Sequence, residues 1–253
     1  MFQSKERRRE RVRETPFSER WKQLLFHRAP LYRSLPAEDR DELHGHIQVL
    51  LAEKHFEGVG GIEVTEGMKL IICAHAALLL LHRETDYFPK LISVLIYPGA
   101  YAVKTQSRDE RGVFSEVVET RAGESWTLGT LILAWEDVGQ DLASIPATRS
   151  VILHEFAHQL DAGSGVMNGA PILSDRKLQH DWPEALSEAY ERLLRAARQH
   201  EPSLLRSYGA KNPPEFFAVA TEAFFLYPVQ LKQGEADLYS ALCHYFKQDP
   251  ASW

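Results

Sequence analysis

The stretch His154-Glu155-Phe156-Ala157-His158 decides how this chain is interpreted, because it follows the pattern H-E-x-x-H. On a helix, residues four apart lie about 40° from each other around the axis, so His154 and His158 share one face. Two imidazoles placed in this way can reach one metal ion, while Glu155 lies beside them as a general base. The alternative is an amphipathic helix that carries two incidental histidines, so the motif needs support from the rest of the chain.

The flanking residues predict that the motif lies on a helix. Ser150 or Thr148 is a suitable N-cap after Pro146, and the helix is expected to run through Asp161. Two glycines, at positions 163 and 165, then end it.

A catalytic zinc ion typically has three protein ligands and one open position, so a third ligand is needed. Glu215 and Glu222 lie seven residues apart on one face of a strongly apolar segment, where a buried carboxylate is costly without a partner. Glu215 is the better ligand candidate and Glu222 the alternative. The other carboxylate would then hold the second ring nitrogen of a ligand histidine. The helix dipole also favours an acidic residue in a first turn, so Glu215 has a purely structural interpretation as well.

Asp161 is the third acidic candidate. It lies three residues after His158, but its short side chain at the helix end predicts a supporting or capping role more than ligation. The metzincin pattern would need glycine at position 161 and histidine at 164. The chain has Asp161 and Ser164 there, which excludes that class.

Composition limits the function classes. The 253-residue chain has a net charge of −6, which gives no support for direct nucleic-acid binding. Its two cysteines, Cys73 and Cys243, are far apart in apolar surroundings, as expected for thiols of a reducing compartment. No signal peptide is visible, and the most apolar run, 70–81, is too short to span a bilayer. We therefore expect a cytoplasmic protein without a membrane span.

The hydrophobic patterns predict an α+β fold that is mainly helical, with a small mixed sheet. Residues 1–14 hold six basic and three acidic side chains and are expected to form a solvated or frayed helical tail, or alternatively a basic arm for a membrane or partner. Residues 15–253 are expected to form one domain, with a helical part over about 15–85 and a catalytic core over about 86–253. Helices are expected from residue 16, from 37, and over about 64–81, 146–161, 183–200 and 214–227; strands are expected over 91–97, 101–105, 113–120 and 130–135. The segment 128–135 is either an edge strand to which a peptide substrate could add or an ordinary core strand.

Several stretches together resemble the Mlc titration factor A family of bacterial zinc peptidases. The central ones are 154–161 (HEFAHQLD), Tyr208 and 215–218 (EFFA). The motifs are also similar to those of the lethal-factor type of zinc metalloprotease. The likeness to the first family extends over residues 16–253 and includes 17–21 (FSERW), 123–126 (GESW), 132–135 (ILAW) and 248–250 (QDP). Pro214 departs from the small residue expected before Glu215, which is harmless at a helix start.

The resemblance implies a zincin-like metallopeptidase with one Zn²⁺ per chain, held by His154, His158 and Glu215. It implies that Glu155 is the general base and that Tyr208 stabilises the transition state. It further implies aminopeptidase-like hydrolysis of short peptides, binding of an Mlc-type transcription repressor and a role in regulating sugar uptake. The alternative is a regulatory protein that sequesters such a repressor and whose peptidase activity is minor or latent.

Overall fold

The structure, a computed structural model, describes residues 4–99, 101–108, 114–121, 123–126, 129–144, 146–173 and 175–253. The helices in this part of the chain are α1 (Lys5–Arg13), α2 (Glu19–Arg28), α3 (Pro30–Ser34), α4 (Ala37–Glu53), α5 (Glu66–Leu78), α6 (Trp135–Ala143), α7 (Val151–Asp161), α8 (Arg176–Gln199), α9 (Pro213–Leu226), α10 (Pro228–Gly234) and α11 (Ala236–Phe246). The strands are β1 (His55–Gly58), β2 (Ser93–Tyr97), β3 (Tyr101–Arg108), β4 (Phe114–Arg121), β5 (Gly123–Trp126) and β6 (Thr130–Ala134). The predicted α+β class with a small mixed sheet is confirmed.

The main sheet has four strands in the order β1-β2-β6-β5. Strands β1, β2 and β6 are parallel, and β5 runs antiparallel to β6. Strand β6 is therefore paired on both sides, so the prediction of an edge strand at 128–135 is wrong for its described part, and the core-strand alternative is confirmed. Leu128, also in that segment, lies outside the described residues. The edge position next to β6 belongs to β5.

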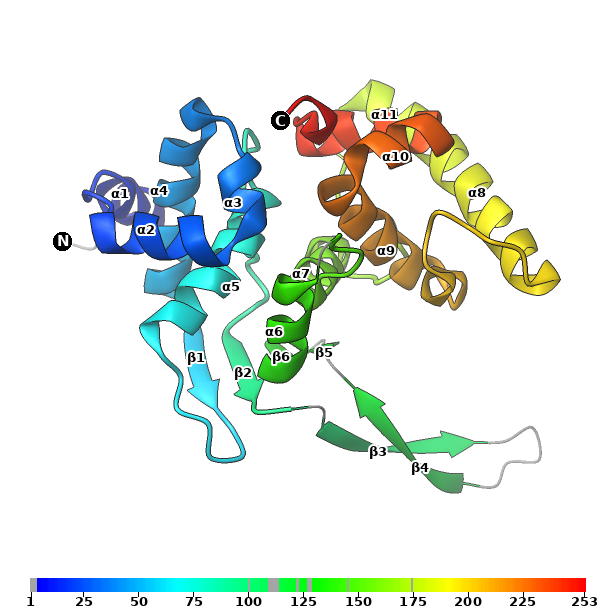
Figure 1. Cartoon of the computed structure of the whole chain (residues 1–253), viewed down its shortest axis with the longest axis horizontal. Coiled ribbons are helices and arrows are strands. Elements are labelled where there is room, and N and C mark those ends of the chain that lie inside the picture. The colour runs from blue at the N-terminus through cyan, green and yellow to red at the C-terminus, as the bar shows by residue number, and fades with distance from the viewer. Residues whose placement is uncertain are drawn as a thin grey trace.

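Strands β3 and β4 form a separate antiparallel hairpin, with Tyr101 opposite Arg121 and Arg108 opposite Phe114. Both strands were predicted from their sequence, although Val113, the first residue of the second one, lies outside the described part. Figure 1 shows that the hairpin extends away from the helices.

Helix α7 lies at the centre of the fold. It contacts β5 and β6 on one side, α5 and α6 beside it, and α9 (Figure 1). Its apolar residues Leu153, Phe156 and Ala157 are almost completely buried, as are Phe217 and Ala218 of α9. Complete burial of a leucine or phenylalanine side chain stabilises a fold by about 1.5–3 kcal/mol. The motif is thus fixed in place by the hydrophobic core itself.

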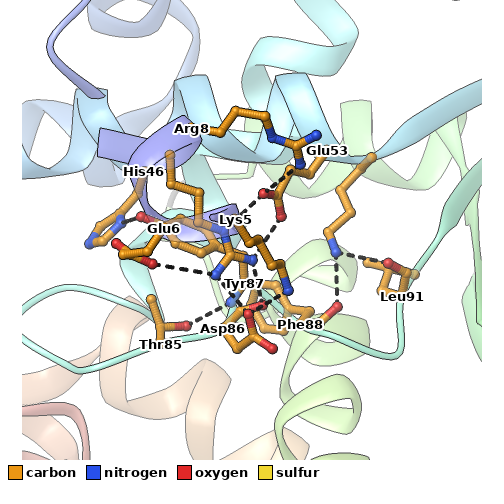
Figure 2. Close-up of polar contacts among 12 residues, drawn as sticks. Lys5, Glu6, Arg8, His46, Glu53, Thr85, Asp86, Tyr87, Phe88 and Leu91 are labelled. Carbon is orange, nitrogen blue, oxygen red and sulfur yellow. Dashed lines mark hydrogen bonds and ion pairs between the residues drawn. The ribbon is translucent and has the colours of Figure 1, made fainter. Parts of the chain in front are cut away.

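Helix α1 is docked on the body of the protein. Arg9 is only 3% exposed and forms ion pairs with Glu53 at 2.8 Å and with Asp86 at 2.7 Å. Figure 2 shows Lys5, Arg8 and the loop around Asp86 gathered at the same place. We call Arg9, Glu53 and Asp86 the N-terminal clamp. Residues 5–13 form a largely exposed helix, as the prediction of a helical tail allowed, but the buried Arg9 docks it through partners far along the chain. The division of the chain at residue 15 stays a prediction.

The clamp holds a loop that reaches helix α7. Tyr87 and Phe88 both have left-handed backbones, with φ of 54° and 52°, which non-glycine residues rarely adopt. The Phe88 ring packs against Phe156 of the motif, with ring centroids 4.9 Å apart. Lys54 donates to the carbonyl oxygens of Phe88 and Leu91 at 2.9 and 2.8 Å. The loop is thus held from both ends against α7.

Some elements differ from the sequence prediction. Helix α8 begins at Arg176 and includes Pro183, which was predicted to start it. Asp175 causes the earlier start, because its side chain accepts hydrogen bonds from the N–H groups of Lys177 and Leu178. Strand β1 and helices α6, α10 and α11 were not predicted. No helix in the described ranges is both long and apolar enough to cross a bilayer.

Candidate metal centre

The helix that carries the motif begins where the sequence predicts. The side chain of Ser150 accepts a hydrogen bond from the N–H of Leu153, which makes Ser150 the N-cap and not Thr148. His154, Glu155 and His158 follow on the buried surface of α7, with exposures of 8%, 5% and 7%. Burial of three ionisable side chains in one helical turn is costly unless they meet partners.

The partner is supplied by α9. Asn212 caps this helix by accepting from the N–H of Glu215 at 3.0 Å, and Pro213 takes the first helical position. Glu215 therefore lies in the first turn, where the helix dipole favours a carboxylate. Because α9 packs along α7, this turn meets the motif.

The structure brings His154, His158 and Glu215 together. Glu215 Oε2 lies 2.9 Å from Nε2 of His154 and 3.4 Å from Nε2 of His158. One ligand atom from each residue lies within 4.8 Å of the other two. The ring planes of His154 and His158 are nearly perpendicular, at 86°. The three side chains thus point to one common space.

Electrostatics in this cluster favour a positive charge. Burial alone would lower the pKa of His154, but its hydrogen bonds with Glu215 and Glu222 outweigh burial and raise that pKa. Burial would likewise raise the pKa of the Glu215 carboxyl, but the two histidines hold it well below its usual range. The two carboxylates thus stabilise positive charge at His154, as they would stabilise a metal cation held between these ligands.

Glu222 holds the far side of His154. It is completely buried, and its Oε1 lies 2.8 Å from Nδ1 of His154. Its Oε2 accepts from the backbone N–H of Ser150 at 2.7 Å, and Arg206 donates to Oε1. A carboxylate bound to Nδ1 leaves Nε2 free to face a metal. Of the two acidic candidates, Glu215 faces both histidines and Glu222 lies behind one of them.

Arg206 is the functional residue that sequence reasoning missed. It lies two residues before Tyr208, in a segment with no helical pattern, and nothing in its spacing connects it with Glu222. Its guanidinium balances a carboxylate that is otherwise buried among helices.

Tyr208 lies at the open side of the cluster. Its hydroxyl donates to Glu215 Oε1 at 3.3 Å, and its ring centroid lies 5.8 Å from that of His154. The side chain is 47% exposed. A phenol at this position can turn from Glu215 toward a bound substrate.

Asp161 supports the chain after α7 and is not part of the ligand cluster. It is completely buried and accepts from the backbone N–H of Gly169 at 2.8 Å and of Asn168 at 3.4 Å. Gly169 has a left-handed φ of 78°, and a Cβ there would lie 2.5 Å from the carbonyl oxygen of Pro213. Asp161 thus fixes a turn that passes closely under the start of α9, which carries Glu215.

The residues present fit a zinc ion. Two histidines and one glutamate are a known ligand set of catalytic zinc, and these three converge without a fourth protein ligand among the described residues. His158 Nδ1 is buried and has no hydrogen-bond partner within the described part of the chain, so this ring lacks the support that Glu222 gives His154.

Comparison with known proteins agrees with this geometry. The family described as glucose-regulated metallo-peptidase M90 matches residues 3–247. An uncharacterized protein of Synechocystis sp. is 36% identical over 244 residues, which cover 96% of this chain and 89% of that protein. Proteins named Mlc titration factor A from Yersinia pestis and Yersinia pseudotuberculosis are 28% identical over 225 residues, covering 87% of this chain and 82% of theirs.

Proposed function

Since the chain belongs to the glucose-regulated metallo-peptidase family M90, we propose that it hydrolyses peptide bonds at the cluster of His154, His158 and Glu215 with one bound Zn²⁺. The single observation that carries this proposal is the convergence of these three side chains from two helices. When bound, the zinc ion would polarise the scissile carbonyl and lower the pKa of the attacking water.

The other site residues have separate roles in this proposal. Glu155 takes a proton from the attacking water and passes it to the leaving amine. Tyr208 donates a hydrogen bond to the carbonyl oxygen as negative charge develops there. Glu222 and Arg206 act through His154, because the carboxylate orients the imidazole and the guanidinium holds that carboxylate in place.

We propose that the substrate backbone lies along β5. This strand pairs with β6 and, among the described strands, with no other, so one of its edges can accept a further strand. Helix α7 contacts β5 directly. A peptide added there would therefore run beside the helix that bears Glu155.

The decisive test is Glu155→Gln, measured for bound zinc and for hydrolysis. We expect the variant to keep one zinc ion per chain and to lose peptidase activity, because Glu155 is the base and not a ligand. Glu184→Gln, at an exposed position of α8, is the matched control and should keep both. Equal hydrolysis by Glu155→Gln and the wild type would refute the proposed mechanism.

Aminopeptidase specificity is a narrower part of the proposal and rests on the family resemblance. It is tested with matched short substrates whose α-amino group is either free or acetylated. Hydrolysis of the free form alone supports an aminopeptidase, whereas equal cleavage of both supports an endopeptidase.

A second proposed role is the binding of an Mlc-type transcription repressor, as the name of the Yersinia relatives suggests. The zinc-loaded Glu155→Gln variant separates the two roles. Repressor binding by this variant would show that binding needs no catalysis. If the wild type is active but binds no repressor, only the enzymatic role remains.

A further inference from the structure

A second cavity lies apart from the metal centre, between helices α2 and α3 and the C-terminal segment. It has a volume of about 540 Å³, and apolar side chains such as Leu31, Val138, Phe225 and Trp253 form much of its wall. None of the three proposed metal ligands lines it. Sites for small molecules are typically concave, largely apolar and about 300–1,000 Å³ in volume, so the cavity has the size of a ligand site.

The cavity wall includes a buried histidine. His75 is only 3% exposed, and its Nδ1 donates to the carbonyl oxygen of Ile71 at 2.9 Å. Since a carbonyl can only accept, the proton of the neutral ring is on Nδ1 and Nε2 is an acceptor. Burial lowers the pKa of His75, which keeps the ring neutral. Within the described residues no hydrogen-bond partner meets Nε2, so the ring offers an acceptor to a ligand that carries a donor.

The rim of the cavity carries positive charge. Arg28 and Arg33 both line it and are exposed, and neither has an ion-pair partner among the residues that the structure describes. Arg149, in contrast, is neutralised by Asp137 at 2.7 Å and Asp141 at 3.1 Å. Two unbalanced guanidinium groups at one rim attract a carboxylate or another organic acid group.

We propose that this cavity binds a small organic anion with an apolar body, whose acid group faces Arg28 and Arg33 and whose hydrogen-bond donor faces His75. The three parts of the ligand follow from three observations, namely the apolar wall, the charged rim and the buried acceptor. A side chain as buried as His75 can be reached by a slim molecule but not by the flat surface of a protein, which favours a small ligand over a docked partner.

The proposal is tested by calorimetric titration of the full-length protein with a panel of small acids that have aromatic or aliphatic bodies. The first probe is 4-hydroxyphenylacetate, which has a phenol donor, a ring and a carboxylate. Phenylacetate lacks the donor and 4-hydroxyphenylacetamide lacks the charge. We expect millimolar or tighter binding of the first probe and at least about fivefold weaker binding of the other two, in line with the loss of one charged or buried hydrogen bond.

Variants locate the binding. Val229 lines the cavity and is 48% exposed, so Val229→Trp should block the entrance without disturbing the core and should abolish binding. Arg28→Gln combined with Arg33→Gln should weaken binding about tenfold. Arg176→Gln, exposed on α8, is the control and should bind like the wild type.

Three results would each overturn the proposal. The first is that no acid of the panel binds with a dissociation constant below about 10 mM. The second is that Val229→Trp leaves the affinity unchanged. The third is that the amide, or the acid without a donor, binds as tightly as 4-hydroxyphenylacetate.

Discussion

The protein contains two clusters of charged side chains, each built around a buried one, and they differ in how the charges are balanced. In the N-terminal clamp, bonds to Glu53 and Asp86 raise the pKa of Arg9, and bonding to Arg9 lowers that of Glu53. These charges satisfy one another. In the metal centre, Glu215 and Glu222 converge on His154 and raise its pKa to about 10. The clamp is therefore complete as folded, whereas the metal centre attracts one more cation.

Loss of a proposed ligand should have the largest effect. We expect Glu215→Ala to lose its zinc and at least about a thousandfold in peptidase activity, because zinc contributes several kcal/mol to the transition state. Metal analysis and kinetics measure both, and Glu201→Ala at an exposed position is the control. A variant that retains one zinc ion per chain would rule out Glu215 as a ligand.

Breaking the clamp should affect stability instead of catalysis. Arg9→Met leaves Glu53 with only its longer contact to the exposed Arg8, at 3.3 Å, and should reduce the free energy of unfolding by about 3 kcal/mol, measured by urea titration. The double variant Arg9→Met with Glu53→Met should lose less, because no charge is stranded. Activity per folded molecule should stay close to that of the wild type at low temperature. An unchanged unfolding midpoint would show that the docked helix α1 is not held by Arg9.

Glu222→Gln tests whether the carboxylate bonded to Nδ1 of His154 strengthens zinc binding. The amide can still accept from Nδ1 but carries no charge, so zinc affinity should fall by between about ten- and a hundredfold. Titration against a competing chelator measures this change. Asp141→Asn, which removes a buried carboxylate outside the ligand cluster, should leave zinc affinity unchanged. The hypothesis fails if both variants bind zinc as the wild type does.

The pH dependence of stability tests the buried His44, whose pKa is lowered, in contrast to His154, whose pKa is raised. Burial lowers the pKa of His44 to about 4, below its value in the unfolded chain. Between about pH 6.5 and 4 the unfolded chain therefore binds an extra proton, and His44 should reduce stability by about 2 kcal/mol between pH 7 and 5. His44→Gln should show a correspondingly smaller loss over the same interval. An identical pH dependence in both proteins would contradict this assignment.

The sequence predicts well those features that depend on neighbours along one helix. The face shared by His154 and His158, the Ser150 cap and the start of α9 at the Pro213-Pro214 pair are all local. The pairing of Glu215 with the motif was also predicted, because an acidic residue in an apolar helix needs a partner.

Contacts between distant segments were not predictable in the same way. The interior position of β6 depends on β2 and β5, so its own residues do not distinguish a central strand from an edge. The burial of Arg9 depends on partners 44 and 77 residues away. The bond from Arg206 to Glu222 depends on how a loop crosses α9, and no periodic pattern describes that loop.

The spacing between the two halves of the proposed metal centre also bears on biosynthesis. Glu215 follows His154 by 61 residues and lies on a helix that reaches α7 only through tertiary packing. A nascent chain that has exposed the motif but not α9 has two imidazoles but lacks the carboxylate of Glu215. Hydrolytic capacity would therefore appear late in translation, after most of the surrounding core has formed, and a ribosome-bound intermediate would pose no threat to neighbouring unfolded chains.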